Sequence, residues 1–128
     1  MLLCAGLVAV GVGGCNRGSD TTQTVVFRFS RFEPETLTVP VDTPITFRLE
    51  NRDPIAHEWI VGPDDVHERH RTGTEPYHDK IPSEVSVPAL ASRETKLTFT
   101  ESGEYRFICH LPGHEAYGMT GTLRVVAD

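Results

Sequence analysis

A short segment near the C-terminus of this 128-residue chain carries three side chains that could bind a transition metal. Cys109, His114 and Met119 follow one another at the spacing C-x4-H-x4-M. A thiolate, an imidazole and a weak thioether, joined by a second imidazole, form the donor set of a blue-copper site that transfers electrons. His57, far upstream in the chain, is the candidate for that second imidazole. The segment therefore predicts a copper ion that shuttles one electron.

The composition limits the classes of protein to which the chain can belong. The chain is long enough for one domain with a substantial core. Its formal net charge is −6, with acidic and basic residues scattered along the sequence. This charge argues against a nucleic-acid partner, for which a basic stripe is expected. A partner steered by long-range charge should be cationic, or should dock through a neutral patch.

The N-terminus has the features of a targeting segment. Residues 2–14 are apolar or small and uncharged, which is too short to cross a bilayer comfortably and typical of a secretory signal. Residues 12–15, with the sequence V-G-G-C, resemble a bacterial lipobox, in which the cysteine becomes lipidated after cleavage. We expect a signal peptide over residues 1–14, a lipidated Cys15 with a polar tether over 15–24, and a folded domain over 25–128. An ordinary cleaved signal peptide and a buried N-terminal strand are the alternatives.

Cys109 is then the only cysteine of the predicted domain, because Cys4 and Cys15 precede it. A disulfide within the domain is impossible, and a lone thiol outside the cytoplasm is a liability unless something occupies it. Metal ligation is one such use, whereas an inert buried thiol is the alternative. His114 could equally be a surface histidine, Met119 a core residue and His57 a residue bonded to backbone. The four side chains together favour a metal.

Apolar residues alternate with polar ones through most of the chain, which indicates β-strands. Short strands at even spacing, separated by Gly and Pro, favour a sandwich or a barrel. In the first strand, Val25, Phe27 and Phe29 should share the buried face. The expected strands cover residues 25–30, 35–39, 45–50, 57–61, 83–87, 94–100, 103–109 and 120–126.

The segment over residues 62–82 is long and polar, and loops of this length in small domains are often functional. A short helix over residues 64–70 would align His67 and His70, which lie three residues apart. With His78 and the nearby Asp79, these histidines could bind a second metal. A solvated loop is the alternative.

Residues 103–125 follow the pattern G-x-Y-x-F-x-C-x-x-P-G-H-x4-M-x-G-x-L-x-V. Together with the upstream pair Ala56-His57, this pattern resembles the cupredoxin family, to which azurin, plastocyanin and rusticyanin belong. The resemblance implies an all-β fold, an eight-stranded Greek-key β-sandwich, with one type 1 copper per chain that alternates between Cu+ and Cu2+. It assigns His57, Cys109 and His114 as equatorial ligands and Met119 as the weak axial ligand.

Three features need separate interpretation. Many cupredoxins have Asn or Ser after the first histidine, where this chain has Glu58, and residues 62–82 have no ready counterpart in plain plastocyanins. The pair Cys109-His110 also resembles the end of the multicopper oxidase signature, whose histidines serve a trinuclear copper cluster. However, Ile108 precedes Cys109 where that signature has histidine, and the chain has no His-x-His pair. We therefore expect His110 to face outward without a metal role.

The resemblance implies an electron carrier, not an enzyme, whose electrons pass through the ring of His114. An apolar docking patch would surround that ring, formed by Leu111, Pro112, Ala116 and Tyr117; ordinary loop apolarity is the alternative. Transient redox proteins favour small interfaces of this kind. We expect a monomer without a small-molecule substrate, anchored on the outer side of a bacterial cytoplasmic membrane or secreted. A copper-handling protein for resistance or delivery, and a copper module of a larger oxidoreductase complex, are the alternative functions.

Overall fold

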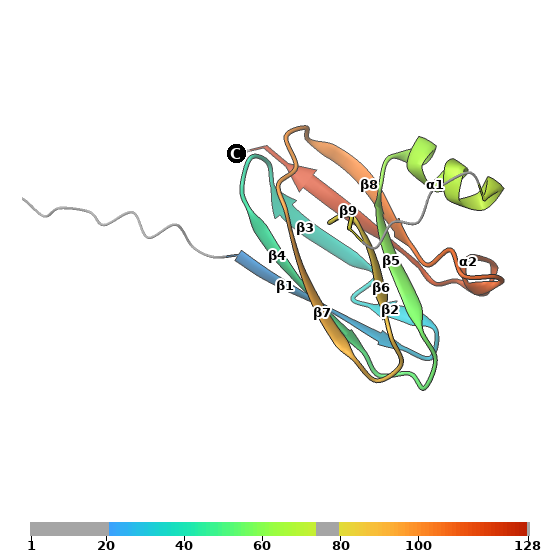
Figure 1. Cartoon of the computed structure of the whole chain (residues 1–128). Helices are drawn as coiled ribbons and strands as arrows, with labels where there is room; N and C mark the ends of the chain where they lie inside the picture. The colour runs from blue at the N-terminus through green and yellow to red at the C-terminus, as the bar shows by residue number, and fades with distance from the viewer. Residues whose placement is uncertain (1–20, 74–79, 128) are drawn as a thin grey trace, which may run out of the picture.

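The computed structural model describes residues 21–73 and 80–127 of the chain, which form a β-sandwich with two helices (Figure 1). The helices are α1 (Asp64–Thr72) and α2 (His114–Tyr117). The strands within the described residues are β1 (Thr21–Arg28), β2 (Arg31–Glu33), β3 (Thr36–Pro40), β4 (Ile45–Asn51), β5 (His57–Gly62), β6 (Glu84–Val87), β7 (Ser92–Leu97), β8 (Gly103–Ile108) and β9 (Thr120–Val126).

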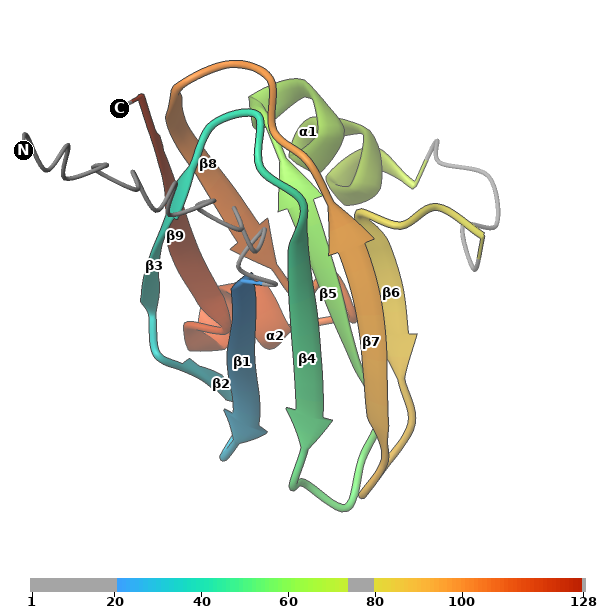
Figure 2. The same ribbon diagram turned by 90° about the vertical axis from the view of Figure 1, so that its left-hand side faces the viewer.

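The strands form two sheets, in the orders β2-β1-β4-β7 and β3-β9-β8-β5-β6. In Figure 2, β1, β4 and β7 lie in front of β9, β8 and β5. The predicted β-sandwich is therefore confirmed, with nine strands in the described residues where eight were expected. The additional strand is β2, which has only three residues and pairs with the end of β1.

The period-two alternation accounts for the core between the sheets. Val25, Phe27, Phe47 and Trp59 are completely buried, as inward positions of β1, β4 and β5 should be. Phe29 breaks the predicted pattern, because 75% of its surface is exposed. The reason is local: β1 ends at Arg28, and Phe29 takes a φ of 54°, which turns its side chain away from the core.

β1 begins earlier than the sequence pattern indicates. Residues 21–24, expected at the end of a polar tether, pair in parallel with β4, from Thr21 opposite Ile45 to Thr24 opposite Arg48. These residues therefore belong to the sheet. The predicted signal peptide and the predicted lipidation site at Cys15 lie outside the described residues. No helix in the described part of the chain is long and apolar enough to cross a membrane.

The polar segment after β5 contains the expected helix, α1. Asp64 and Asp65 occupy its first turn, and Gly73 ends it in the left-handed conformation at a φ of 70°. Acidic residues at the start of a helix and glycine after its end both stabilise it. α1 packs against β5 and β8, next to the loop that follows β8 (Figure 1). The position of this helix determines the surroundings of His110.

Candidate metal centre

Four side chains from separate parts of the chain meet at the end of the sandwich that carries α2. His57 is the first residue of β5, Cys109 directly follows β8, His114 begins α2, and Met119 directly precedes β9. His57, Cys109 and Met119 are completely buried, whereas His114 is partly exposed. The potential ligand atoms of His57, Cys109 and His114 lie within 4.8 Å of one another. The fold thus brings together the three side chains predicted as equatorial ligands, with the predicted axial residue beside them.

The three donors face one another closely. His114 Nδ1 lies 3.3 Å from Cys109 Sγ and 3.2 Å from His57 Nδ1. Burial raises the pKa of the Cys109 thiol, and the backbone N–H groups of Glu58 and Leu111 offset this only in part. Burial, together with the facing ring of His57, lowers the pKa of His114. Neutral imidazoles have a free lone pair, which is the form that binds a metal.

Asp53 orients His57, although no role for Asp53 was predicted from the sequence. Its Oδ2 lies 2.8 Å from His57 Nε2. Burial raises the pKa of this carboxyl, but hydrogen bonds from Ser30 N–H, from His57 and from Phe29 N–H outweigh it, so the pKa lies below its ordinary value. The Asp53 carboxylate therefore accepts the Nε2–H of His57, and His57 Nδ1 keeps its lone pair toward the other donors. A carboxylate behind a metal-binding histidine is a common arrangement in proteins.

The ligand loop is fixed by its own backbone. Cys109 N–H donates to the Met119 carbonyl at 3.1 Å, and Met119 N–H donates to the His114 carbonyl at 3.0 Å. Gly118 has a φ of 116°, and a Cβ at this position would lie only 2.7 Å from Arg31 Nη1. Glycine therefore suits this position for two reasons, its conformation and the close approach of Arg31.

Glu58, which departs from the family pattern, supports the site through its backbone. Its N–H donates to Cys109 Sγ at 3.3 Å. Any residue except proline at this position can make that hydrogen bond. The hydrogen bond to the Cys109 sulfur is therefore present although residue 58 is glutamate. A backbone N–H that donates to this sulfur stabilises its thiolate form.

This donor set fits copper. A cysteine sulfur and two imidazole nitrogens, with a buried methionine next to them, are the ligands of a blue-copper site. Bound copper would supply a reversible one-electron couple. The frame that surrounds it is dry and rigid, because three of the four side chains are completely buried and both histidine orientations are fixed by fold and hydrogen bonds.

Comparisons with known proteins agree with the geometry. Residues 22–126 match the family described as copper binding proteins, plastocyanin/azurin family. The chain therefore belongs to this family: it is a cupredoxin, with copper as its cofactor and one site per chain.

The chain is similar to a characterised relative and to solved structures. It is 30% identical over 116 residues to the copper-resistant cuproprotein CopI of Rubrivivax gelatinosus, which covers 88% of this chain and 70% of CopI. The dithionite-reduced auracyanin of Roseiflexus castenholzii superimposes with a TM-score of 0.69 at 22% identity, over 84% of this chain and 98% of that one. Auracyanin B gives a TM-score of 0.68 at 25% identity, over 83% and 88%.

The residues predicted to surround His114 differ in their exposure. Pro112, Ala116 and Tyr117 are exposed, with 58% of Tyr117 accessible. Leu111 is only partly exposed and packs against the core. The Arg31 guanidinium lies 5.0 Å from the centre of the Tyr117 ring, so a cation covers part of this aromatic surface. Leu111 therefore has a structural role besides any contact with a partner.

His110 does not face outward, and that prediction was wrong. Only 4% of its side chain is exposed, and its Nε2 lies 2.9 Å from His67 Nδ1 on α1. The reason is that α1 packs beside the ligand loop, which the sequence pattern does not reveal. His70 points its Nδ1 to the Val66 carbonyl at 2.7 Å. His78 and Asp79, the other members of the predicted second metal site, lie outside the described residues.

Proposed function

We propose that this chain is an electron carrier that works outside the cytoplasm and exchanges one electron at a time through His114. The carrying observation is the burial of His57, Cys109 and Met119 behind a single partly exposed donor, His114. An electron that leaves the metal has its shortest path to solvent through that ring. The family membership supports this role, since cupredoxins are electron-transfer proteins.

The surrounding residues keep the donors in place when the charge at the metal changes. Asp53 fixes the His57 ring, Glu58 N–H holds the Cys109 sulfur, and the backbone of the ligand loop fixes His114. Donors held by rigid elements need little movement between the two oxidation states. Exclusion of water from the three buried donors has the same effect, because no solvent shell must rearrange.

A spectroscopic titration tests the proposed function. We expect the copper-loaded chain to show an intense visible absorption from the bond between Cys109 and copper, with reversible one-electron behaviour. Its EPR spectrum should show the narrow copper hyperfine splitting of a thiolate-bound ion. Colourless copper that exchanges readily with a chelator would contradict a carrier.

Docking of a partner at His114 is a separate part of the proposal. Pro112, Ala116 and Tyr117 provide the exposed surface around the ring. We expect Ala116→Asp to slow electron exchange with a redox partner protein and to leave the visible absorption unchanged. Val126→Asp is the matched control, because it adds the same charge at an exposed apolar position at the other end of β9. Equal exchange rates in the two variants would exclude this surface.

The proposed location includes a lipid anchor at Cys15, which rests on the sequence V-G-G-C. Several acyl chains on one residue bind a membrane more firmly than one chain does. Mass spectrometry of the protein from its native membrane should find a lipid on Cys15, and Cys15→Ser should release the domain. An unmodified chain that begins at a residue beyond Cys15 would indicate secretion instead.

Copper resistance is the second candidate function, favoured by the similarity to the copper-resistant cuproprotein CopI. The two functions differ in what happens to the metal: a carrier keeps its copper, whereas a handling protein passes it on. Deletion of the gene should reduce growth at high copper if resistance is the role, and should impair an electron-transfer reaction at low copper if carrying is the role.

A further inference from the structure

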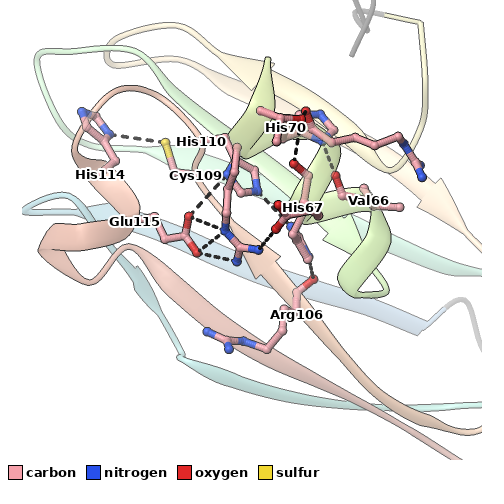
Figure 3. A network of polar contacts seen from close by, with 12 residues as sticks. Val66, His67, His70, Arg106, Cys109, His110, His114 and Glu115 are labelled. Carbon is pink, nitrogen blue, oxygen red and sulfur yellow. Dashed lines mark hydrogen bonds and ion pairs between the residues drawn. The ribbon is translucent and has the colours of Figure 1, made fainter. Parts of the chain in front are cut away.

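A second pair of facing imidazoles lies next to the ligand loop, outside the copper centre. His67 on α1 is 1% exposed, and the side chain of His110, which directly follows Cys109, is 4% exposed. His67 Nδ1 and His110 Nε2 are 2.9 Å apart (Figure 3). Burying two histidines face to face is costly unless each has partners. We call these two residues the α1 histidine pair.

Each ring of the α1 histidine pair is held by a partner on its other nitrogen. His67 Nε2 lies 3.0 Å from the carbonyl oxygen of Arg106, so Nε2 carries the proton and His67 Nδ1 presents a lone pair to His110. His110 Nδ1 faces Glu115 Oε2 at 3.7 Å. Arg71 fixes that carboxylate from α1, with Nη2 2.6 Å from Glu115 Oε1. Carbonyl and carboxylate groups behind imidazoles are the supports that metal-binding histidines usually have.

We propose that His67 Nδ1 and His110 Nε2 bind a second, exchangeable transition-metal ion, with copper(II) as the preferred ion. Imidazole nitrogens suit copper, zinc and nickel, and copper(II) ranks first in affinity among the divalent ions. Metal–nitrogen bonds of about 2.0–2.1 Å place two adjacent ligands roughly 2.9 Å apart in the square-planar geometry that copper(II) favours, and roughly 3.3 Å apart in a tetrahedral site. The pair must therefore open by at most a few tenths of an ångström. The proton that His110 Nε2 donates to His67 can move to His110 Nδ1, which faces the Glu115 carboxylate at 3.7 Å.

One member of the pair, His110, borders a hollow at the surface. This hollow of about 360 Å³ lies between α1 and the ligand loop, with His70, Arg71, His110 and Glu115 among its lining residues. Water from this hollow can complete the coordination of the ion. His70 stacks on His110, with ring centres 5.2 Å apart and planes 18° apart, which fixes the plane of the His110 ring.

This site goes beyond the proposed function, because it holds metal as cargo and not as the redox cofactor. It is nevertheless adjacent to the cofactor: one peptide bond joins His110 to the ligand Cys109. A chain that handles copper would then have a place to receive an ion next to the centre that retains one.

Metal content tests the second site. The copper centre of the full chain is first loaded with copper(II), and excess metal is removed. We then expect the chain to bind a second, added copper(II), whose EPR signal has the wide hyperfine splitting typical of nitrogen ligands alone. His67→Gln should weaken that copper at least ~10-fold and leave the visible absorption of the first unchanged. Glu68→Gln is the matched control on α1, because the Glu68 side chain is 68% exposed and contacts Arg71 at 3.5 Å. One copper per chain in the wild type, or equal affinity in His67→Gln and Glu68→Gln, would overturn the proposal.

A second measurement needs no variant. In the chain with reduced copper, which is diamagnetic, added Zn(II) should shift the NMR resonances of the His67 and His110 rings. The resonances of His57 and His114 should stay in place. Zinc that shifts neither ring of the α1 histidine pair would also overturn the site. Loss of the visible absorption reports failure of the copper centre, so the two proposals fail independently.

Discussion

Two pairs of facing imidazoles lie close to Cys109, and they differ in what surrounds them. His57 and His114 are 3.2 Å apart and share a sulfur donor, with three ligand atoms within 4.8 Å. His67 Nδ1 and His110 Nε2 are 2.9 Å apart. Among the described residues, no third histidine, cysteine or carboxylate places a ligand atom within 4.8 Å of both. In the first pair, His57 lies on β5 and His114 begins α2 in the loop between β8 and β9, whereas the second pair depends on the packing of α1 beside that loop.

The comparison shows that facing imidazoles alone do not define what a metal site does. A soft sulfur and a frame built on neighbouring strands of one sheet suit an ion that stays and changes oxidation state. Two nitrogens beside a surface hollow, held by the packing of one helix, suit an ion that comes and goes. Variants that remove one feature at a time can break this distinction or sharpen it.

The largest effect is expected from removing the sulfur. Cys109→Ser retains the size of a completely buried side chain but loses the soft donor. We expect the intense visible absorption to disappear and copper affinity at the centre to fall by more than about 100-fold, beyond the effect of losing a supporting residue. Absorption spectra and a copper titration measure this. If an intense band survived, Cys109 would not be the ligand that separates the two sites.

The next effect concerns the support of His57. Asp53→Asn keeps the shape of the side chain but replaces a carboxylate oxygen that accepts hydrogen bonds with an NH2 group. We expect about a 10–100-fold loss of copper affinity and a fall of about 1–3 kcal/mol in the free energy of unfolding. Copper titration and urea denaturation measure these changes.

The pH dependence of this variant adds a control. The folded-state pKa of Asp53 lies below its ordinary value of 3.8, so its stabilising effect is present above that pH and is lost as pH falls through the folded-state pKa. The stability difference between wild type and Asp53→Asn should therefore shrink in acid. Glu50→Gln, in an exposed pair with Arg52, should leave copper affinity unchanged; an equal loss there would point to a general charge effect.

The sequence predicts the copper ligands well because three of the four lie close together in the chain. Cys109, His114 and Met119 lie in one loop between two strands, so spacing alone reveals them. Asp53 escaped prediction because Asn-Arg-Asp-Pro has the composition of a turn. An aspartate four residues before a predicted histidine ligand was the available signal.

The fold was predictable to a similar extent, and for a similar reason. Alternation reveals strands with a buried face. The helix considered at residues 64–70, within a long polar segment, agrees with α1 to within a few residues. Alternation misses β2, which is too short to alternate, and the turn at Phe29, which depends on one positive φ. The surroundings of His110 depend on how α1 packs against β5 and β8, a long-range contact that no local pattern encodes.

A smaller effect is expected from the α1 histidine pair in the metal-free protein. Burial lowers the pKa of His67 and is the largest influence on it; the Arg106 carbonyl opposes this, and Arg71 adds to it. Because the folded state then binds fewer protons than the unfolded state, stability should fall as pH drops below the ordinary value of 6.5. His67→Gln should flatten this dependence while costing about 1 kcal/mol near pH 7.5.

Urea denaturation of the metal-free protein at pH 7.5 and pH 5 measures that dependence. The wild type should lose more stability between these two pH values than His67→Gln does. Parallel losses in the two proteins would mean that His67 is not kept neutral by its surroundings, and the second pair would lose its resemblance to a metal-ready site.

The smallest effect is expected from the ion pair that joins α1 to the ligand loop. Arg71 contacts Glu115 from an exposed position, and pairs of this kind contribute about 0.2–1 kcal/mol. Arg71→Gln should therefore barely change the free energy of unfolding or the visible absorption. It should still weaken the binding of the second metal ion more than that of the first, because Glu115 faces His110 and not a ligand of the copper centre.

Metal titrations of Arg71→Gln and Arg69→Gln separate these effects, because Arg69→Gln alters a neighbouring exposed pair with Asp65. Equal weakening of both metal ions in Arg71→Gln would show that α1 serves the copper centre as much as the second pair.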